Sequence, residues 1–190
     1  MGQYAMPFPG RELADKELSY DLCYPKIPPE DRKAIVEQAW QKGCDAARQV
    51  YARESGCTDF SAICRRSGLT LQEKDTDFVT GGQRYFSDYL SGKNLITLYL
   101  RSVSLWAEEN HVDVDTAKNL ILSHEYFHYL EMNELGLTSR MYQVPMLQIG
   151  KLRLGKTGIR ALSEIGAHAF ARTYFELSQK EEPHGTQSQL

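Results

Sequence analysis

The sequence predicts an α+β fold in which a short β-sheet packs on helices. Three observations indicate it: apolar residues recur at helical spacing after residue 29, a β-prone run covers 95–100, and the strongest helical pattern covers 115–134. The chain has 190 residues, which suits one domain with a substantial core. Its hydrophobic fraction of 42% and aromatic fraction of 11% exclude general disorder.

The charge balance argues against two classes of partner. The chain carries 22 Lys and Arg residues against 25 Asp and Glu residues, a formal net charge of −3. This gives no electrostatic reason to expect nucleic acid or a membrane as a partner. No apolar run approaches the length that spans a bilayer, and the N-terminus lacks the basic start and apolar stretch of a signal peptide. We therefore expect a cytoplasmic protein whose four cysteines are reduced thiols.

The N-terminal third is expected to be an arm followed by two helices. Residues 1–28 are rich in proline and predict an irregular arm that lies over the domain. A helix is expected to begin at Pro28 or Pro29 and to end at Ser55-Gly56, because apolar residues then recur on one face. A short helix should follow from Thr58 or Asp59 through Arg66.

The middle of the chain predicts strands. The expected strands cover 69–72, 77–80, 84–90 and 95–100. The turn chemistry of residues 91–94 predicts that the last two form a hairpin. If the strand over 95–100 lies at the sheet edge, it could pair with an extended peptide. A short helix is expected over 102–110.

The C-terminal part predicts two long helices. The first runs from Asp115, as N-cap, to Glu134, and its apolar residues cover much of its circumference, so it should be central. Residues 136–157 are expected to be a long loop, with a short strand over 143–149. A final helix covers 158–178. The predicted domain is therefore 29–178, followed by a disordered tail over 179–190.

The central helix carries the motif HExxH, as His124-Glu125-Tyr126-Phe127-His128. One helical turn takes about 3.6 residues, so His124 and His128 share a face and can offer two imidazole nitrogens to one ion. Glu125 is rotated by about 100° from His124 and can reach a water held by the metal without binding the metal itself. The motif therefore predicts a Zn²⁺ centre with Glu125 as general base.

A catalytic zinc site needs a third protein ligand, and the final helix offers one. Glu164 lies far enough beyond His128 for the chain to turn back and pack antiparallel on the first helix. It would complete a site of two histidines and one glutamate. Gly166 and Ala167 are small enough to let the helices approach closely. His168, one turn after Glu164, shares its face and is the rival ligand.

These two motifs together resemble the ImmA/IrrE family of bacterial zinc metallo-endopeptidases. Members have an HExxH helix and a later helix that reads roughly E-x-x-A-N-x-F-A, and this chain reads E-x-x-A-H-A-F-A from Glu164 to Ala171. Family members usually have Gly before the second His, where this chain has Phe127, and His168 stands where Asn is common. A minigluzincin, a minimal zinc peptidase, would show the same HExxH and distal glutamate.

The resemblance implies a small zincin-like domain with a short twisted sheet, an active-site helix and a later helix that bears the third ligand. It implies His124, His128 and Glu164 as zinc ligands and Glu125 as the general base. It also implies a protein or peptide substrate, such as a helix-turn-helix transcriptional repressor. The chain has no DNA-binding module of its own, so such a partner would be separate.

Two further residues could support the site. His168 could hydrogen-bond a ligand carboxylate, donate to the oxyanion of the reaction, or simply pack between the helices. Glu131 could orient His128 through the free ring N–H, although a solvated charge is the more common state of such a residue. Several tyrosines surround the motif, and most are expected to serve in packing.

The sequence thus predicts a zinc-dependent metallopeptidase. The alternative is a zinc-binding regulatory or toxin–antitoxin component with the same fold that has lost catalysis. The retained Glu125 disfavours it, because a purely structural site needs no base. A structural zinc site closed by His168 as fourth ligand is a third possibility.

Overall fold

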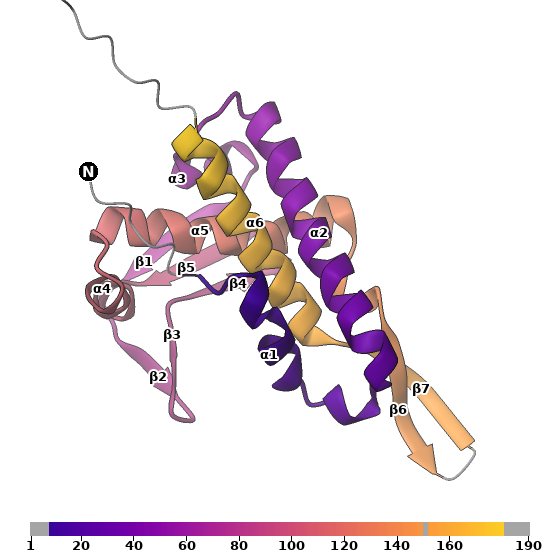
Figure 1. Cartoon of the computed structure of the whole chain (residues 1–190). Helices are drawn as coiled ribbons and strands as arrows, with labels where there is room; N and C mark the ends of the chain where they lie inside the picture. Colours follow the sequence, from indigo (N-terminus) through magenta and orange to yellow (C-terminus); the bar gives the residue numbers. More distant parts are fainter. Residues whose placement is uncertain (1–7, 150–151, 181–190) are drawn as a thin grey trace, which may run out of the picture.

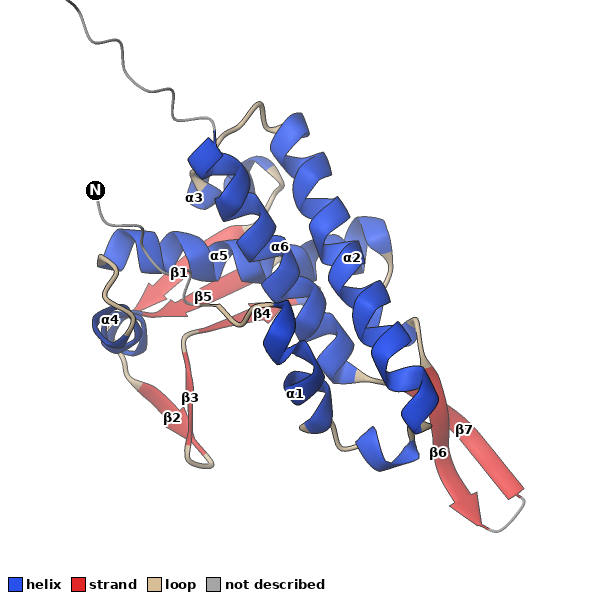
Figure 2. Cartoon of the chain, in the orientation of Figure 1, coloured by secondary structure: helices blue, strands red, loops and turns tan. Residues whose placement is uncertain are grey.

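The computed structural model describes residues 8–149 and 152–180, and it is a mixed α+β fold with small sheets packed on helices (Figures 1 and 2). The helices are α1 (Ala14–Ser19), α2 (Pro29–Arg53), α3 (Phe60–Arg66), α4 (Leu100–Glu109), α5 (Val114–Leu130) and α6 (Arg160–Lys180). The strands are β1 (Thr70–Lys74), β2 (Phe78–Thr80), β3 (Gln83–Tyr85), β4 (Ser87–Leu90), β5 (Leu95–Tyr99), β6 (Gln143–Ile149) and β7 (Leu152–Gly158). None of the helices in these ranges is long and apolar enough to cross a membrane.

The N-terminal segment is more regular than predicted. Residues 8–28 contain α1 and a short 3₁₀ helix over Tyr24–Lys26, so the expectation of an irregular arm is wrong for this part. Ala14 and Leu18 lie one turn apart and are both buried, which gives α1 an apolar face. Together with Ile27 they belong to a core cluster shared with α2 and α6. Residues 1–7 of the predicted arm lie outside the described residues.

Helix α2 begins as expected and packs along α6. Pro29 is its first residue, and the backbone leaves the helix before Ser55 and Gly56, which both have positive φ. Figure 1 shows α2 and α6 side by side over most of their lengths. They touch at Gly43, where an added Cβ would lie 2.1 Å from the Gly166 carbonyl oxygen. The contact therefore requires glycine at position 43.

The main sheet has the strand order β1-β5-β4. Strands β4 and β5 form the predicted hairpin, in which Leu90 pairs with Leu95, and β1 runs parallel to β5. The strand predicted over 84–90 is divided at Phe86, because β3 pairs with β2 whereas β4 pairs with β5. Strand β5 is central and mostly buried, so it does not lie at the sheet edge, which was the condition for its pairing with a peptide. The edge strands of this sheet are β1 and β4.

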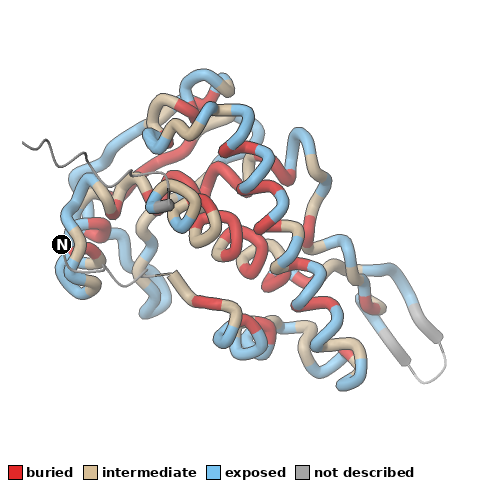
Figure 3. Tube along the Cα trace, turned by 45° about the horizontal axis from the view of Figure 1, so that its top comes forward, coloured by how far each residue is buried: buried red, intermediate tan, exposed pale blue. Residues whose placement is uncertain are grey.

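Helix α5 is central, as its apolar pattern predicts. It contacts the sheet, α3, α4 and α6. The buried stretches lie in the middle of the molecule (Figure 3). Its N-cap is Asp113 and not the expected Asp115, since the Asp113 carboxylate accepts the Thr116 backbone N–H at 2.8 Å. The helix continues through one π-helical stretch, Glu131–Leu135, and Gly136 ends it with a φ of 72°.

The region predicted as a long loop is a hairpin. The strand expected over 143–149 is present as β6, and it pairs with β7 in antiparallel register, with Gln143 opposite Gly158. The hairpin extends away from the helices (Figure 1). The second strand has a weak signal in the sequence, because the run LRLGKTG has little β-branched or alternating apolar character. Helix α6 reaches Lys180, and the rest of the predicted disordered tail lies outside the described residues.

Candidate metal centre

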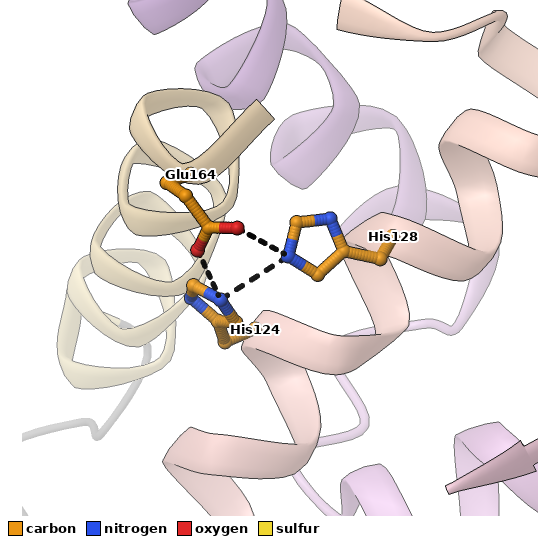
Figure 4. A group of neighbouring side chains, drawn as sticks. All are labelled: His124, His128 and Glu164. Carbon is orange, nitrogen blue, oxygen red and sulfur yellow. Dashed lines mark hydrogen bonds and ion pairs between the residues drawn. The ribbon is translucent and has the colours of Figure 1, made fainter. Parts of the chain in front are cut away.

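Three predicted ligands converge where α6 crosses α5 (Figure 4). Because His124 and His128 are four residues apart on α5, their Nε2 atoms approach to 3.2 Å. Glu164 of α6 faces both rings: its Oε2 lies 3.3 Å from His124 Nε2 and its Oε1 lies 3.8 Å from His128 Nε2. The donor atoms of these three residues all lie within 4.8 Å of one another, and the group could hold a metal ion.

The spacing of the donor atoms fits a small tetrahedral ion. Ligand atoms about 2.0–2.1 Å from one Zn²⁺ at tetrahedral angles lie about 3.3 Å apart. The separations of 3.2 Å between the two His Nε2 atoms and 3.3 Å between His124 Nε2 and Glu164 Oε2 are close to that value, and one donor atom from each residue lies within 4.8 Å of the other two. Within the described chain His168 is not a member of this group, so the geometry favours Glu164 over His168 as the third ligand.

Glu131 contacts His128 at Nδ1, the ring nitrogen that does not approach His124 and Glu164. It is only 2% exposed, so its more common state as a solvated charge does not apply here. Its Oε2 lies 3.0 Å from His128 Nδ1, while its Oε1 accepts hydrogen bonds from the Thr138 backbone N–H at 2.7 Å and the Ser163 hydroxyl at 2.9 Å. These contacts fix the carboxylate, which in turn fixes the ring of His128 with Nε2 toward the group.

The same contact sets the protonation of His128. Burial alone would lower the pKa of this imidazole, but the hydrogen bond with Glu131 and the charges of Glu164 and Glu125 raise it to about 9. Burial would raise the pKa of Glu131, and the His128 and Thr138 hydrogen bonds lower it instead. In the metal-free fold, His128 and Glu131 therefore form an ion pair.

Glu164 is held as a carboxylate. Burial opposes its charge, but the hydrogen bond with His124 and the charges of His124 and His128 bring the pKa of Glu164 well below its usual value. Its side chain is 41% exposed, so one side of the group is open to solvent. In α1, burial and then the charge of Glu164 raise the pKa of Glu17.

Glu125 lies beside the metal group and is positioned by a residue that the sequence does not single out. It is 8% exposed, and one of its carboxylate oxygens, Oε1, accepts a hydrogen bond from the Ser87 hydroxyl at 2.6 Å. Ser87 is the first residue of β4, one of the two edge strands of the main sheet. A serine at the start of a strand carries no signal by itself, because only the packing of α5 on the sheet brings it to Glu125.

His168 packs between aromatic rings. Its ring centroid lies 5.2 Å from that of His124 and 5.7 Å from that of Phe8, and within the described part of the chain it makes no hydrogen bond to Glu164. Burial, and then the charge of His124, lower the pKa of His168 to about 3, so its ring is neutral. Of its three predicted roles, the contacts match packing at the helix interface.

Two tyrosines, Tyr126 inside the motif and Tyr129 directly after it, bind residues outside the metal group through their hydroxyls. The Tyr126 hydroxyl receives a hydrogen bond from Arg53 and lies 2.8 Å from the Ser67 hydroxyl. Tyr129 donates to the Ser67 carbonyl at 3.0 Å. Both contacts tie α5 to α2 and to the end of α3, so they serve packing as expected.

No protein-family model, curated protein sequence or solved structure matches this chain. What the arrangement can do chemically follows from the residues alone. Two imidazoles and a carboxylate form an open group of three ligands, and a second carboxylate, Glu125, is held next to it. Such a set suits a metal ion that keeps one coordination position free.

Proposed function

We propose that this chain is a zinc-dependent metallo-endopeptidase. One observation carries the proposal: one donor atom from each of His124, His128 and Glu164 lies within 4.8 Å of the other two, and the residue next to His124, Glu125, has a buried carboxylate. Two His nitrogens and one Glu oxygen are a common catalytic zinc set, whereas structural zinc sites have four protein ligands. The described residues offer three, which disfavours a purely structural site.

Each residue of the site would have its own role in the hydrolysis of a peptide bond. Zn²⁺, when bound, supplies a Lewis acid and lowers the pKa of water to near neutrality. Glu125 accepts a proton from the attacking water and delivers it to the leaving amine. Ser87 donates to one oxygen of Glu125, which fixes the side chain and leaves the other oxygen to carry the proton.

The substrate we propose is a protein or peptide. The order of α2, α3, the small sheet, α5 and α6, together with the two motifs, supports a zincin-like domain similar to the ImmA/IrrE family. A helix-turn-helix repressor is then the substrate we propose first. Strand β4 supports an extended peptide as ligand, because it is one of the two edge strands of the main sheet and its first residue, Ser87, donates a hydrogen bond to Glu125.

The substitution Glu125→Gln tests the proposal. Zinc-loaded wild type and variant are incubated with a proteome-derived peptide library, and new peptide ends are identified by mass spectrometry. We expect the wild type to cleave, and Glu125→Gln to lose about 10²–10⁴-fold in rate while it keeps its zinc. Equal cleavage by both proteins contradicts the role of Glu125. Zinc binding without cleavage in either protein favours the non-catalytic regulatory alternative.

A further inference from the structure

An aromatic side chain from the chain's own N-terminal segment lies against the metal group. The Phe8 ring stacks on His124, with 5.5 Å between the ring centroids and 20° between the planes. It also lies 5.7 Å from the ring of His168 and 5.6 Å from that of Trp106. Phe8 is thus enclosed by one ligand histidine and by residues of α4 and α6, although it is only half-buried.

The aromatic residues around Phe8 extend toward Glu125, the proposed general base. Trp106 of α4 lies 6.0 Å, between ring centroids, from Phe86. Phe86 immediately precedes Ser87, which holds Glu125. The aromatic contacts of Phe8 therefore extend from His124 to the start of strand β4, next to Glu125. A peptide paired with β4 would lie on this side of the site.

Helix α6 contacts both the side chain and the backbone carbonyl of Phe8. Glu164, His168 and Arg172 are each four residues apart and share one face. Glu164 belongs to the metal group, His168 contacts the Phe8 ring, and Arg172 Nη1 donates to the Phe8 carbonyl oxygen at 2.9 Å. A pocket for a side chain and a hydrogen bond to the adjacent carbonyl are the two contacts by which proteins hold one residue of an extended peptide.

We propose that His124, Trp106, His168 and Arg172 form a subsite for an aromatic residue of a bound peptide, and that Phe8 fills this subsite in the free protein. That the peptide is a substrate rests on the proposed function. The subsite itself rests only on the contacts of Phe8. Aromatic rings on its walls favour an aromatic occupant over a small aliphatic one. Phe8 competes with any such peptide, so its removal should raise the affinity for an aromatic ligand.

The test measures binding of N-acetyl-phenylalaninamide through the fluorescence of Trp106, in protein that carries Trp40→Phe so that Trp106 is the one tryptophan left. We expect Phe8→Ala to bind this probe about 10-fold more tightly or better, because the competing occupant is gone. Phe8→Leu, which keeps an apolar side chain for packing, should also bind more tightly. Leu13→Ala is the matched control, since Leu13 lies in the same segment but is 46% exposed.

The outcomes separate this subsite from the proposed function. A gain in both Phe8 variants, with none in Leu13→Ala and none for N-acetyl-alaninamide, supports the subsite even if the zinc-loaded wild type cleaves no peptide. Unchanged affinity in Phe8→Leu, or an equal gain for N-acetyl-alaninamide, overturns the subsite even if peptides are cleaved. The thermal midpoint and zinc content of each variant are measured on the same samples.

Discussion

At the scale of single residues, Glu131 connects the metal group to the fold. It is buried, and its two oxygens accept from His128, Thr138 and Ser163, which come from α5, the turn after it and α6. A buried carboxylate with this many partners is fixed in place. The orientation of His128 therefore depends on a residue three positions later in the chain.

The substitution Glu131→Gln should weaken zinc binding. We expect a loss of about 10–100-fold in affinity, because the amide holds His128 less firmly and makes it a weaker ligand. Glu134→Gln is the matched control: Glu134 lies three residues further on, is half-exposed and pairs with Arg53 outside the site. Competition with a chromophoric chelator measures both affinities. Equal losses in the two variants would contradict the orienting role.

The ion pair of His128 and Glu131 predicts a pH dependence of the metal-free protein. The pKa of His128 is raised from 6.5 to about 9 in the fold. A group with a raised folded-state pKa stabilises fully below its unfolded pKa, and this contribution is lost as the pH rises through the folded value. The free energy of unfolding should therefore fall between pH 6.5 and about 9. Urea titrations should show this fall in the wild type and a smaller one in Glu131→Gln.

At the scale of elements, the position of α6 depends on small residues. Gly43 of α2 meets Gly166 of α6, and an added Cβ at Gly166 would lie 2.8 Å from the Phe127 ring. Phe127 lies inside the HExxH motif and is fully buried. Its ring occupies the space that a side chain at position 166 would need, so the contact requires glycine there. This packing sets how closely Glu164, two residues before Gly166, approaches the two histidines.

The substitution Gly43→Ala should destabilise the fold by about 3 kcal/mol, because the new methyl group meets backbone and the helices must separate. Gly92→Ala is the matched control, since an added Cβ there has no heavy atom within 4 Å. Thermal unfolding measures both. A Gly43→Ala protein as stable as Gly92→Ala would contradict the close contact of α2 and α6.

The elements that the sequence predicts well are those with a strong local signal. Helices α2, α3, α5 and α6 and the β4–β5 hairpin have periodicity, caps or turn residues that specify them. The β7 strand and α1 have weak local patterns and depend on their partners, β6 in one case and α2 and α6 in the other. The central place of β5 also follows from tertiary pairing, because a β-prone run does not show which strand lies at an edge.

The candidate site also contains residues that local motifs predict and residues that only tertiary packing brings together. His124, Glu125 and His128 follow from one helix, and Glu164 from a second motif. Ser87 and Phe8 could not be predicted as neighbours of the site, because only the packing of β4 and of the N-terminal segment brings them there. Glu131 has the right spacing from His128, but its burial depends on the turn over 138–140 and on α6.

At the scale of the whole molecule, α6 joins two core clusters. Its first half, with Leu162 and Ile165, packs with α1 and α2 together with the preceding residue Ile159, while its second half, with Phe170 and Tyr174, packs with α5 and the sheet. Glu164 lies near the junction. A metal ion held between α5 and α6 would therefore tie both clusters together, so zinc should raise the stability of the entire chain.

The zinc content of the purified protein tests the central claim most directly. Elemental analysis of wild type, Glu164→Ala and His168→Ala gives the metal per chain. We predict about one zinc in the wild type and in His168→Ala, and loss of zinc in Glu164→Ala, as expected for a site of three protein ligands. Zinc retained in Glu164→Ala but lost in His168→Ala, or no zinc in any sample after zinc is added, would contradict the account.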